Sequence, residues 1–153
     1  MSQIIHIKTA ELAVGDRNRQ ITTNSIGSCV IVVLWDPVQK IGGLVHAMLP
    51  HRHEDLERVY PGKYVDEAID NLLAAVIARG AKRENLHAKI IGGAAMFEKI
   101  DPAERVGPRN VKAARDKLRE LNIFVEKEDT GGSSGRTVSF NIATGAVDIH
   151  SSI

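Results

Sequence analysis

The stretch Ile26-Gly27-Ser28-Cys29-Val30-Ile31-Val32-Val33-Leu34 runs from a glycine turn into a series of β-branched and aliphatic residues. A second apolar stretch, Gly42-Gly43-Leu44-Val45-His46-Ala47-Met48-Leu49-Pro50, follows the turn-like Asp36-Pro37-Val38-Gln39. Apolar runs joined by a short turn are typical of antiparallel strand pairs, so the two stretches predict a β-hairpin. Its strands carry Cys29, the only cysteine of the chain, and His46.

The register of this hairpin decides how close Cys29 and His46 lie. A turn centred on Pro37-Val38 places the two residues directly opposite each other, with Cβ atoms about 4.5–5.5 Å apart. A longer loop that extends through Lys40-Ile41 makes His46 a diagonal neighbour instead. Both registers leave the two side chains on one face of the sheet, because strand side chains alternate with a period of two.

A thiol facing an imidazole is the arrangement of an activated nucleophile. An imidazolium beside the sulfur would lower the thiol pKa, because the positive charge favours the thiolate. A lone cysteine is also commonly an inert small hydrophobe, and a histidine on an apolar strand is commonly a core residue. The pair is therefore a candidate catalytic pair that the hairpin alone does not establish.

Composition indicates a small protein with little net charge. The chain has 153 residues, a usual length for a single domain, here 1–153. With 20 basic and 19 acidic residues, the formal charge of +1 favours neither nucleic acid nor an anionic membrane as the main partner. One cysteine excludes an internal disulfide, and no stretch approaches the ~20 apolar residues of a membrane span. Without an apolar leader, we expect a cytoplasmic protein with no membrane insertion.

The apolar spacing elsewhere predicts both helices and strands. A helix from Tyr64 to Arg79 has one apolar stripe and ends at Gly80, and a second helix runs from about Asn110 to Leu121. Further strands are expected over 3–7, 20–23, 87–91, 123–125, 137–142 and 146–149. The pattern predicts strand pairs packed against each other with helices outside, a layered α+β arrangement.

Nine short motifs, in order along the chain, resemble those of a known family. They are Ile26-Gly27-Ser28-Cys29-Val30, Trp35-Asp36-Pro37, Gly42-Gly43, His46-Ala47-Met48-Leu49-Pro50, Lys63-Tyr64, residues 88–97, Gly107-Pro108-Arg109-Asn110, Asp129-Thr130-Gly131-Gly132 and Gly135-Arg136. Together they resemble the CheD family, the chemoreceptor glutamine deamidases of bacterial and archaeal chemotaxis. The resemblance extends from about Thr22 to about Val147, nearly the whole chain.

The resemblance implies a fold and a set of catalytic residues. The fold is one of layered mixed β-sheets packed with flanking helices, shared with the catalytic domain of the cytotoxic necrotizing factors, which are also cysteine-dependent glutamine deamidases. The implied catalytic residues are Cys29, His46 and Thr23, six positions before the cysteine. Thr22 is adjacent and is the alternative for the third position.

The implied activity is that of a protein-glutamine glutaminase, a cysteine-dependent amidohydrolase that acts on the chemoreceptor cytoplasmic domain. An amide is a poor electrophile with a poor leaving group, so a thiolate must attack and an acid must protonate the departing nitrogen. Cys29 would attack, His46 would transfer the proton, and Thr23 would hold the imidazole. Backbone N–H groups around Gly27 to Cys29 are candidates for an oxyanion hole. No metal or organic cofactor is implied.

Two other functions remain open. The resemblance also implies binding to a CheC-type phosphatase of the response regulator, so the chain could act mainly as a regulatory partner. A general cysteine amidase or esterase for small molecules is the third candidate. The sequence does not decide which receptor glutamines are chosen, whether glutamyl methyl esters are cleaved, or the oligomeric state.

Four other motifs give weaker predictions. Asp129-Thr130-Gly131 spells the aspartic-protease tripeptide but occurs once, whereas that chemistry needs two carboxylates. The glycine-rich stretch 129–136 is interpreted as a loop beside the site rather than a phosphate cradle. His51 and His53 are spaced like metal ligands without a completing cluster, so solvated loop residues are expected. Gly92-Gly93 indicates a close approach of backbone segments that could also form the floor of a substrate groove.

Overall fold

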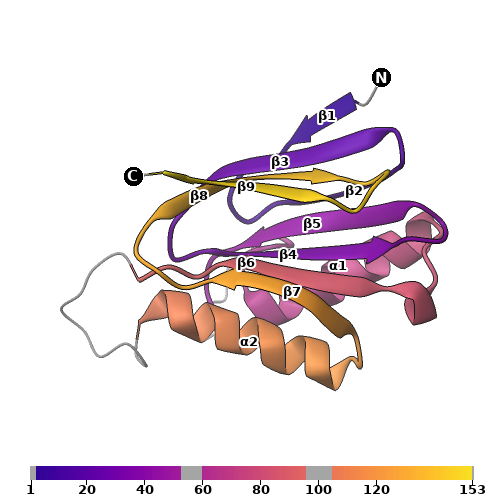
Figure 1. The fold of residues 1–153 in the computed structure, drawn as a ribbon. Helices are drawn as coiled ribbons and strands as arrows, with labels where there is room; N and C mark the ends of the chain where they lie inside the picture. Colours follow the sequence, from indigo (N-terminus) through magenta and orange to yellow (C-terminus); the bar gives the residue numbers. More distant parts are fainter. Residues whose placement is uncertain (1–2, 53–59, 96–104, 153) are drawn as a thin grey trace.

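The computed structural model describes residues 3–52, 60–95 and 105–152. In these residues, nine strands form two stacked sheets, and two α-helices cover the outer face of the larger sheet (Figure 1). The smaller sheet has the strand order β1-β3-β8-β9, and the larger has the order β2-β5-β4-β6-β7. The predicted layered α+β fold is therefore confirmed.

The elements have the following bounds. The smaller sheet contains β1 (Gln3–His6), β3 (Arg19–Ile26), β8 (Gly135–Asn141) and β9 (Val147–Ser152). The larger sheet contains β2 (Leu12–Asp16), β5 (Ile41–Ala47), β4 (Val30–Asp36), β6 (His87–Gly92) and β7 (Phe124–Thr130). The helices are α1 (Val65–Arg79), the 3₁₀ turn η1 (Arg83–Asn85) and α2 (Val106–Glu120). Both sheets are mixed, because β1 pairs with β3 and β6 with β7 in parallel while the other pairs are antiparallel.

Strand β4 lies at the centre of the larger sheet and is buried on both faces. Val32 and Leu34 belong to the core under the helices, whereas Ile31 and Val33 belong to the core between the two sheets. This double burial explains why β4 is a continuous apolar run rather than an alternating one. Each such side chain contributes roughly 1.5–3 kcal/mol when fully buried, so burial on both faces anchors β4 firmly in the fold.

The helix predictions agree with the structure except at one start. Helix α1 ends at Arg79 as expected, and Gly80 follows with a φ of 120°, a conformation that glycine adopts without strain. Helix α2 begins at Val106, so the expected start at Asn110 is wrong by about one turn. Pro108 lies in this first turn, where its missing N–H would have had no helical partner. Neither α-helix in the described residues is long and apolar enough to cross a membrane.

One strand, β2, is not predicted by the sequence patterns. It is short, contains Gly15, and is mostly half-buried, so it lacks a clear apolar alternation. It forms because it pairs with β5 at the edge of the larger sheet, with Leu12 opposite Val45. Tertiary pairing therefore overrides a weak local signal here.

Candidate active site

The β4–β5 hairpin places His46 diagonally from Cys29. In this ladder His46 lies opposite Ile31, and Asp36 lies opposite Ile41, so the loop spans residues 37–40. The expected direct opposition of Cys29 and His46 is therefore wrong, and the longer-loop alternative is correct. The Cα atoms of diagonal neighbours lie about 7–8 Å apart, a separation that longer side chains can bridge.

The loop adopts this length because of its own side chains. The Asp36 carboxylate accepts hydrogen bonds from the N–H groups of Val38 at 2.9 Å and Gln39 at 3.0 Å. Lys40 closes the turn with a φ of 55°. A two-residue loop on Pro37 would require a primed turn with a positive φ at its first position, which the proline ring forbids.

Cys29 and His46 share the face that points toward the smaller sheet, as the period-two argument predicts. Cys29 directly precedes β4, is half-buried, and contacts the core cluster between the sheets. His46 is fully buried on β5. The thiol and the imidazole therefore lie at the same end of the interior, with the thiol nearer the surface.

Thr23 reaches His46 from the opposite sheet. The Thr23 Oγ1 atom on β3 lies 2.7 Å from His46 Nδ1, and the threonine side chain is buried. The neighbouring Thr22 makes a similar contact elsewhere, with its Oγ1 atom 2.7 Å from Nδ1 of His6 in an exposed environment. Of the two adjacent threonines, only Thr23 contacts His46 in the described structure.

A β-bulge separates Thr23 from the glycine turn. The β3–β8 register shifts between Thr23, which is opposite Val138, and Ile26, which is opposite Arg136. An extra residue in one strand lets both Thr23 and Ile26 point into the interior, although strict alternation would send them to opposite faces. Both are buried. The bulge thus allows one strand to supply a polar contact to His46 and an apolar anchor for the Cys29 turn.

Burial keeps both candidate reactive groups neutral. Desolvation raises the pKa of the Cys29 thiol, and the backbone N–H of Cys29 itself lowers it to a smaller degree. Desolvation also lowers the pKa of His46 to about 4. The resting pair is a thiol and a neutral imidazole, which differs from the expected thiolate–imidazolium pair. His46 Nε2 is buried and has no hydrogen-bond partner among the described residues.

The lowered pKa of His46 should make the fold sensitive to acid. The unfolded chain binds this proton near pH 6.5 and the folded chain only near pH 4, so the free energy of unfolding falls as the pH drops through that window. At 1.36 kcal/mol per pKa unit, the total loss is ~3 kcal/mol. Urea unfolding across this range should show a loss that is absent in His46→Gln. An equal slope in both proteins would contradict this assignment.

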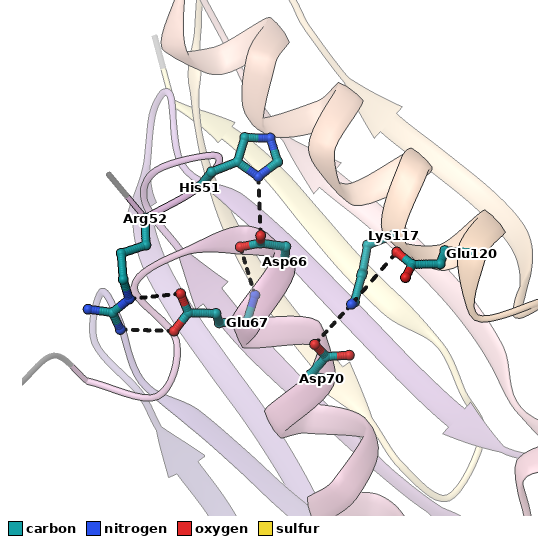
Figure 2. Close-up of polar contacts among 7 residues, drawn as sticks. All are labelled: His51, Arg52, Asp66, Glu67, Asp70, Lys117 and Glu120. Atoms are coloured by element: carbon teal, nitrogen blue, oxygen red, sulfur yellow. Dashed lines mark hydrogen bonds and ion pairs between the residues drawn. The ribbon is translucent and has the colours of Figure 1, made fainter. Parts of the chain in front are cut away.

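Ion pairs attach the segment after β5 to α1, and α2 to α1 (Figure 2). His51 Nδ1 lies 3.2 Å from Asp66 Oδ2, and Arg52 makes two contacts of 2.9 Å with the Glu67 carboxylate. Lys117 Nζ on α2 lies 2.9 Å from Asp70 Oδ2 on α1. Such partly exposed pairs are worth about 0–1 kcal/mol each, so they orient the segment that leaves His46 more than they stabilise the protein.

The residues of the weaker sequence motifs make structural contacts or lie at the surface. A Cβ on Gly92 would lie 2.6 Å from the Cys29 carbonyl oxygen, which confirms the expected close approach of backbone segments. Asp129 lies in β7 and contacts Arg136 Nη2 at 3.3 Å. His51 is exposed as expected, whereas His53, Met96 and Phe97 lie outside the described residues. No group of three or more histidine, cysteine or acidic residues in the described ranges could hold a metal ion.

A cavity of about 250 Å³ lies away from these residues. It is lined by Lys89, Lys127 and Asp129 together with apolar residues of β6, of β9 and of the turn before β9, and it includes none of Cys29, His46 and Thr23. Among the described residues, its lining contains no cysteine, serine, threonine or histidine. We therefore locate the candidate site by its chemistry, a thiol and an unpartnered imidazole nitrogen, rather than by the volume of a cavity.

Asn110 is a residue of the site that sequence reasoning does not assign. It is fully buried, and its Nδ2 atom lies 2.9 Å from both the Ser28 and the Met48 carbonyl oxygens. An asparagine at a helix start is ordinarily a cap, and the expected start of α2 at Asn110 concealed its position in the second turn. The available signal is an amide on the buried stripe that continues through Ala114 and Leu118.

Comparisons with known proteins identify similar chains. Residues 48–151 match the family model described as CheD chemotactic sensory transduction. A Methanococcus vannielii protein named "Probable chemoreceptor glutamine deamidase CheD" is 42% identical over 146 residues, covering 95% of this chain and 94% of the relative. A Halalkalibacterium halodurans protein named "Chemoreceptor glutamine deamidase CheD" is 43% identical over 155 residues, covering 97% and 94%. A Thermotoga maritima protein of that name is 42% identical over 145 residues, covering 95% and 88%.

One solved structure shares the architecture at low sequence identity. A Neisseria meningitidis protein of family DUF152 is 11% identical with a TM-score of 0.50, covering 85% of this chain and 65% of that chain. This likeness concerns the fold alone. A weaker likeness is to the C-terminal domain of CNFy from Yersinia pseudotuberculosis, which is 13% identical, covers 97% of this chain and 62% of that chain, and has a TM-score of 0.33.

Proposed function

This chain belongs to the CheD family, and we propose that it converts glutamine side chains of chemoreceptors to glutamate with release of ammonia. Relatives named as chemoreceptor glutamine deamidases align over 88–94% of their own length, which supports one functional domain over 1–153. The proposed location is the cytoplasm, where a catalytic thiol stays reduced.

The contact between Thr23 and His46 is the observation that carries the proposal. A 2.7 Å contact from the opposite sheet holds Nδ1, and it leaves Nε2 as the nitrogen available for proton transfer. The role of base requires the tautomer in which Nδ1–H donates to Thr23 Oγ1. With Cys29 as the nucleophile, His46 would be the base and Thr23 the orienting group of a triad whose members come from three different segments.

The first half-reaction forms a thioester. The Cys29 thiol proton passes to Nε2 of the neutral His46 as Sγ attacks the substrate amide carbon. The imidazolium then protonates the amide nitrogen, the C–N bond breaks and ammonia leaves. A neutral resting pair suits this sequence, because His46 must be unprotonated to accept the thiol proton.

The second half-reaction restores the enzyme. His46 takes a proton from water as the water oxygen attacks the thioester carbon, the C–S bond breaks, and the proton returns to sulfur. In both halves, backbone N–H groups of the turn from Gly27 to Cys29 stabilise the oxyanion.

A receptor cytoplasmic fragment tests the activity. The unaltered protein should release ammonia and convert specific receptor glutamines to glutamate, as measured by the mass of each peptide. The alternative, mainly regulatory binding of a CheC-type phosphatase, predicts a stable complex with that phosphatase and no change at any glutamine. Deamidation that the phosphatase inhibits would support both roles through one surface.

Removing the Thr23 hydroxyl should slow turnover specifically. Thr23→Val keeps the side-chain shape but loses the contact with Nδ1, so kcat should fall about 10- to 100-fold while KM changes little. Thr23→Ser, which keeps the hydroxyl, should retain most activity. The matched control is Thr22→Val, which removes the equivalent contact with His6 and should leave kcat unchanged. Equal effects at the two threonines would argue against an orienting role for Thr23.

A further inference from the structure

All three carbonyl groups of the turn from Gly27 to Cys29 accept hydrogen bonds, two from the segment after β6 and one from α2. The Gly27 carbonyl accepts a hydrogen bond from Ala94 N–H at 3.0 Å, and the Cys29 carbonyl accepts one from Gly93 N–H at 2.8 Å. The Ser28 carbonyl between them accepts one from a side chain, Asn110 Nδ2, at 2.9 Å. The turn is thus held by its carbonyl groups.

The Asn110 amide also binds the strand end beyond His46. The same Nδ2 atom lies 2.9 Å from the carbonyl oxygen of Met48, so both N–H donors of the amide have acceptors. Because both partners can only accept, the amide must present nitrogen to them. Its Oδ1 atom is buried and has no hydrogen-bond partner among the described residues. A buried asparagine ordinarily has hydrogen-bond partners for both the nitrogen and the oxygen of its amide. Because the oxygen here lacks a partner, the function of Asn110 lies in its two N–H donors.

On the basis of the proposed function, we infer that Asn110 is a positioning residue that sets the oxyanion hole by fixing the plane of the Ser28–Cys29 peptide. In a planar trans peptide the C=O and N–H bonds point in opposite directions. A Ser28 carbonyl held by Asn110 therefore directs the Cys29 N–H away from α2. In the proposed mechanism this N–H belongs to the nucleophilic residue itself and is one of the donors of the oxyanion hole.

The position of Asn110 in α2 makes this contact possible. The helix begins at Val106, and a Cβ on Gly107 would lie only 2.2 Å from the Ala94 carbonyl oxygen. Glycine at this position lets the first turn of α2 approach the segment that follows β6. Asn110, one turn later, then reaches the Cys29 turn from a fully buried position.

Two variants of Asn110 test the inference on a receptor fragment. Asn110→Ala removes the amide, and Asn110→Leu removes it while retaining side-chain volume. Loss of an oxyanion donor lowers kcat about 10²- to 10³-fold, so both variants should lose kcat on that order with KM nearly unchanged. Alkylation of Cys29 by iodoacetamide forms no oxyanion, so its rate should be retained. Leu118→Ala, which creates a cavity under the same helix, should lower thermal stability. It should not lower kcat selectively while the alkylation rate is retained.

Three outcomes would overturn the inference. Unchanged kcat in both Asn110 variants, or a parallel loss of alkylation and deamidation, would mean that Asn110 does not act through the peptide plane. The backbone amide resonance of Cys29 in an NMR spectrum can be measured without any substrate. It should shift in Asn110→Ala and not in Leu118→Ala. An unshifted resonance would also contradict the inference. Lack of deamidation by the unaltered protein would instead count against the proposed function alone.

Discussion

Replacing Cys29 by alanine should abolish ammonia release from a receptor fragment while the protein still folds. Loss of a catalytic nucleophile lowers kcat by on the order of 10⁴-fold or more. Cys29 is half-buried and lies outside the regular strand, so its truncation should change the free energy of unfolding by no more than about 1 kcal/mol. Ammonia release measures the first effect, and urea unfolding measures the second.

Cys29→Ser sharpens this test because it keeps an oxygen nucleophile at the same position. An alcohol ionises far less readily than a thiol, so the serine variant should also be inactive although it is nearly isosteric. Full ammonia release by either folded variant would show that Cys29 is not the nucleophile. If Cys29→Ala is inactive and also fails to unfold cooperatively, its inactivity could come from a disrupted fold. A folded but inactive Cys29→Ser would then assign the loss to the missing thiol.

Replacing His46 by glutamine should produce the second-largest effect. The variant retains side-chain volume at a fully buried position but loses the group that accepts the thiol proton. General acid–base catalysis contributes about 10²- to 10⁴-fold, so kcat should fall within that range. Steady-state deamidation of the receptor fragment measures this loss.

Alkylation of Cys29 in the same variant tests the charge state of the pair. Burial raises the thiol pKa and lowers that of His46, so no imidazolium assists thiolate formation in the free protein. The pH profile of iodoacetamide alkylation should therefore be similar in His46→Gln and in the unaltered protein, and titrate above the ordinary thiol range. A fast reaction near neutral pH that disappears in the variant would instead indicate a thiolate–imidazolium pair.

The sequence was sufficient to identify Cys29 and His46 as a pair on one face. Their shared face follows from strand periodicity and holds for both hairpin registers considered. The register itself could not be predicted, because it depends on the Asp36 carboxylate binding the N–H groups of Val38 and Gln39 and on the positive φ of Lys40. These are side-chain and turn details that apolar patterns do not contain.

The contacts that complete the site cross between elements and could not be derived from local patterns. Thr23 follows from the family resemblance, but its contact with His46 depends on the stacking of two sheets and on a bulge after Thr23. Asn110 belongs to a recognised motif, yet its role depends on α2 starting one turn earlier than expected. Long-range packing, rather than propensity, determines both contacts.

Trapping the acyl-enzyme with hydroxylamine is the most direct test of the account. A thioester on Cys29 reacts with hydroxylamine as well as with water, so receptor glutamines should be converted partly to glutamyl hydroxamate, with a fraction that rises with hydroxylamine concentration. Mass spectrometry of the receptor peptides measures this fraction, which should be zero in Cys29→Ala. Glutamate as the sole product at every hydroxylamine concentration, with ammonia release unaltered, would contradict a thioester intermediate and with it the proposed role of Cys29.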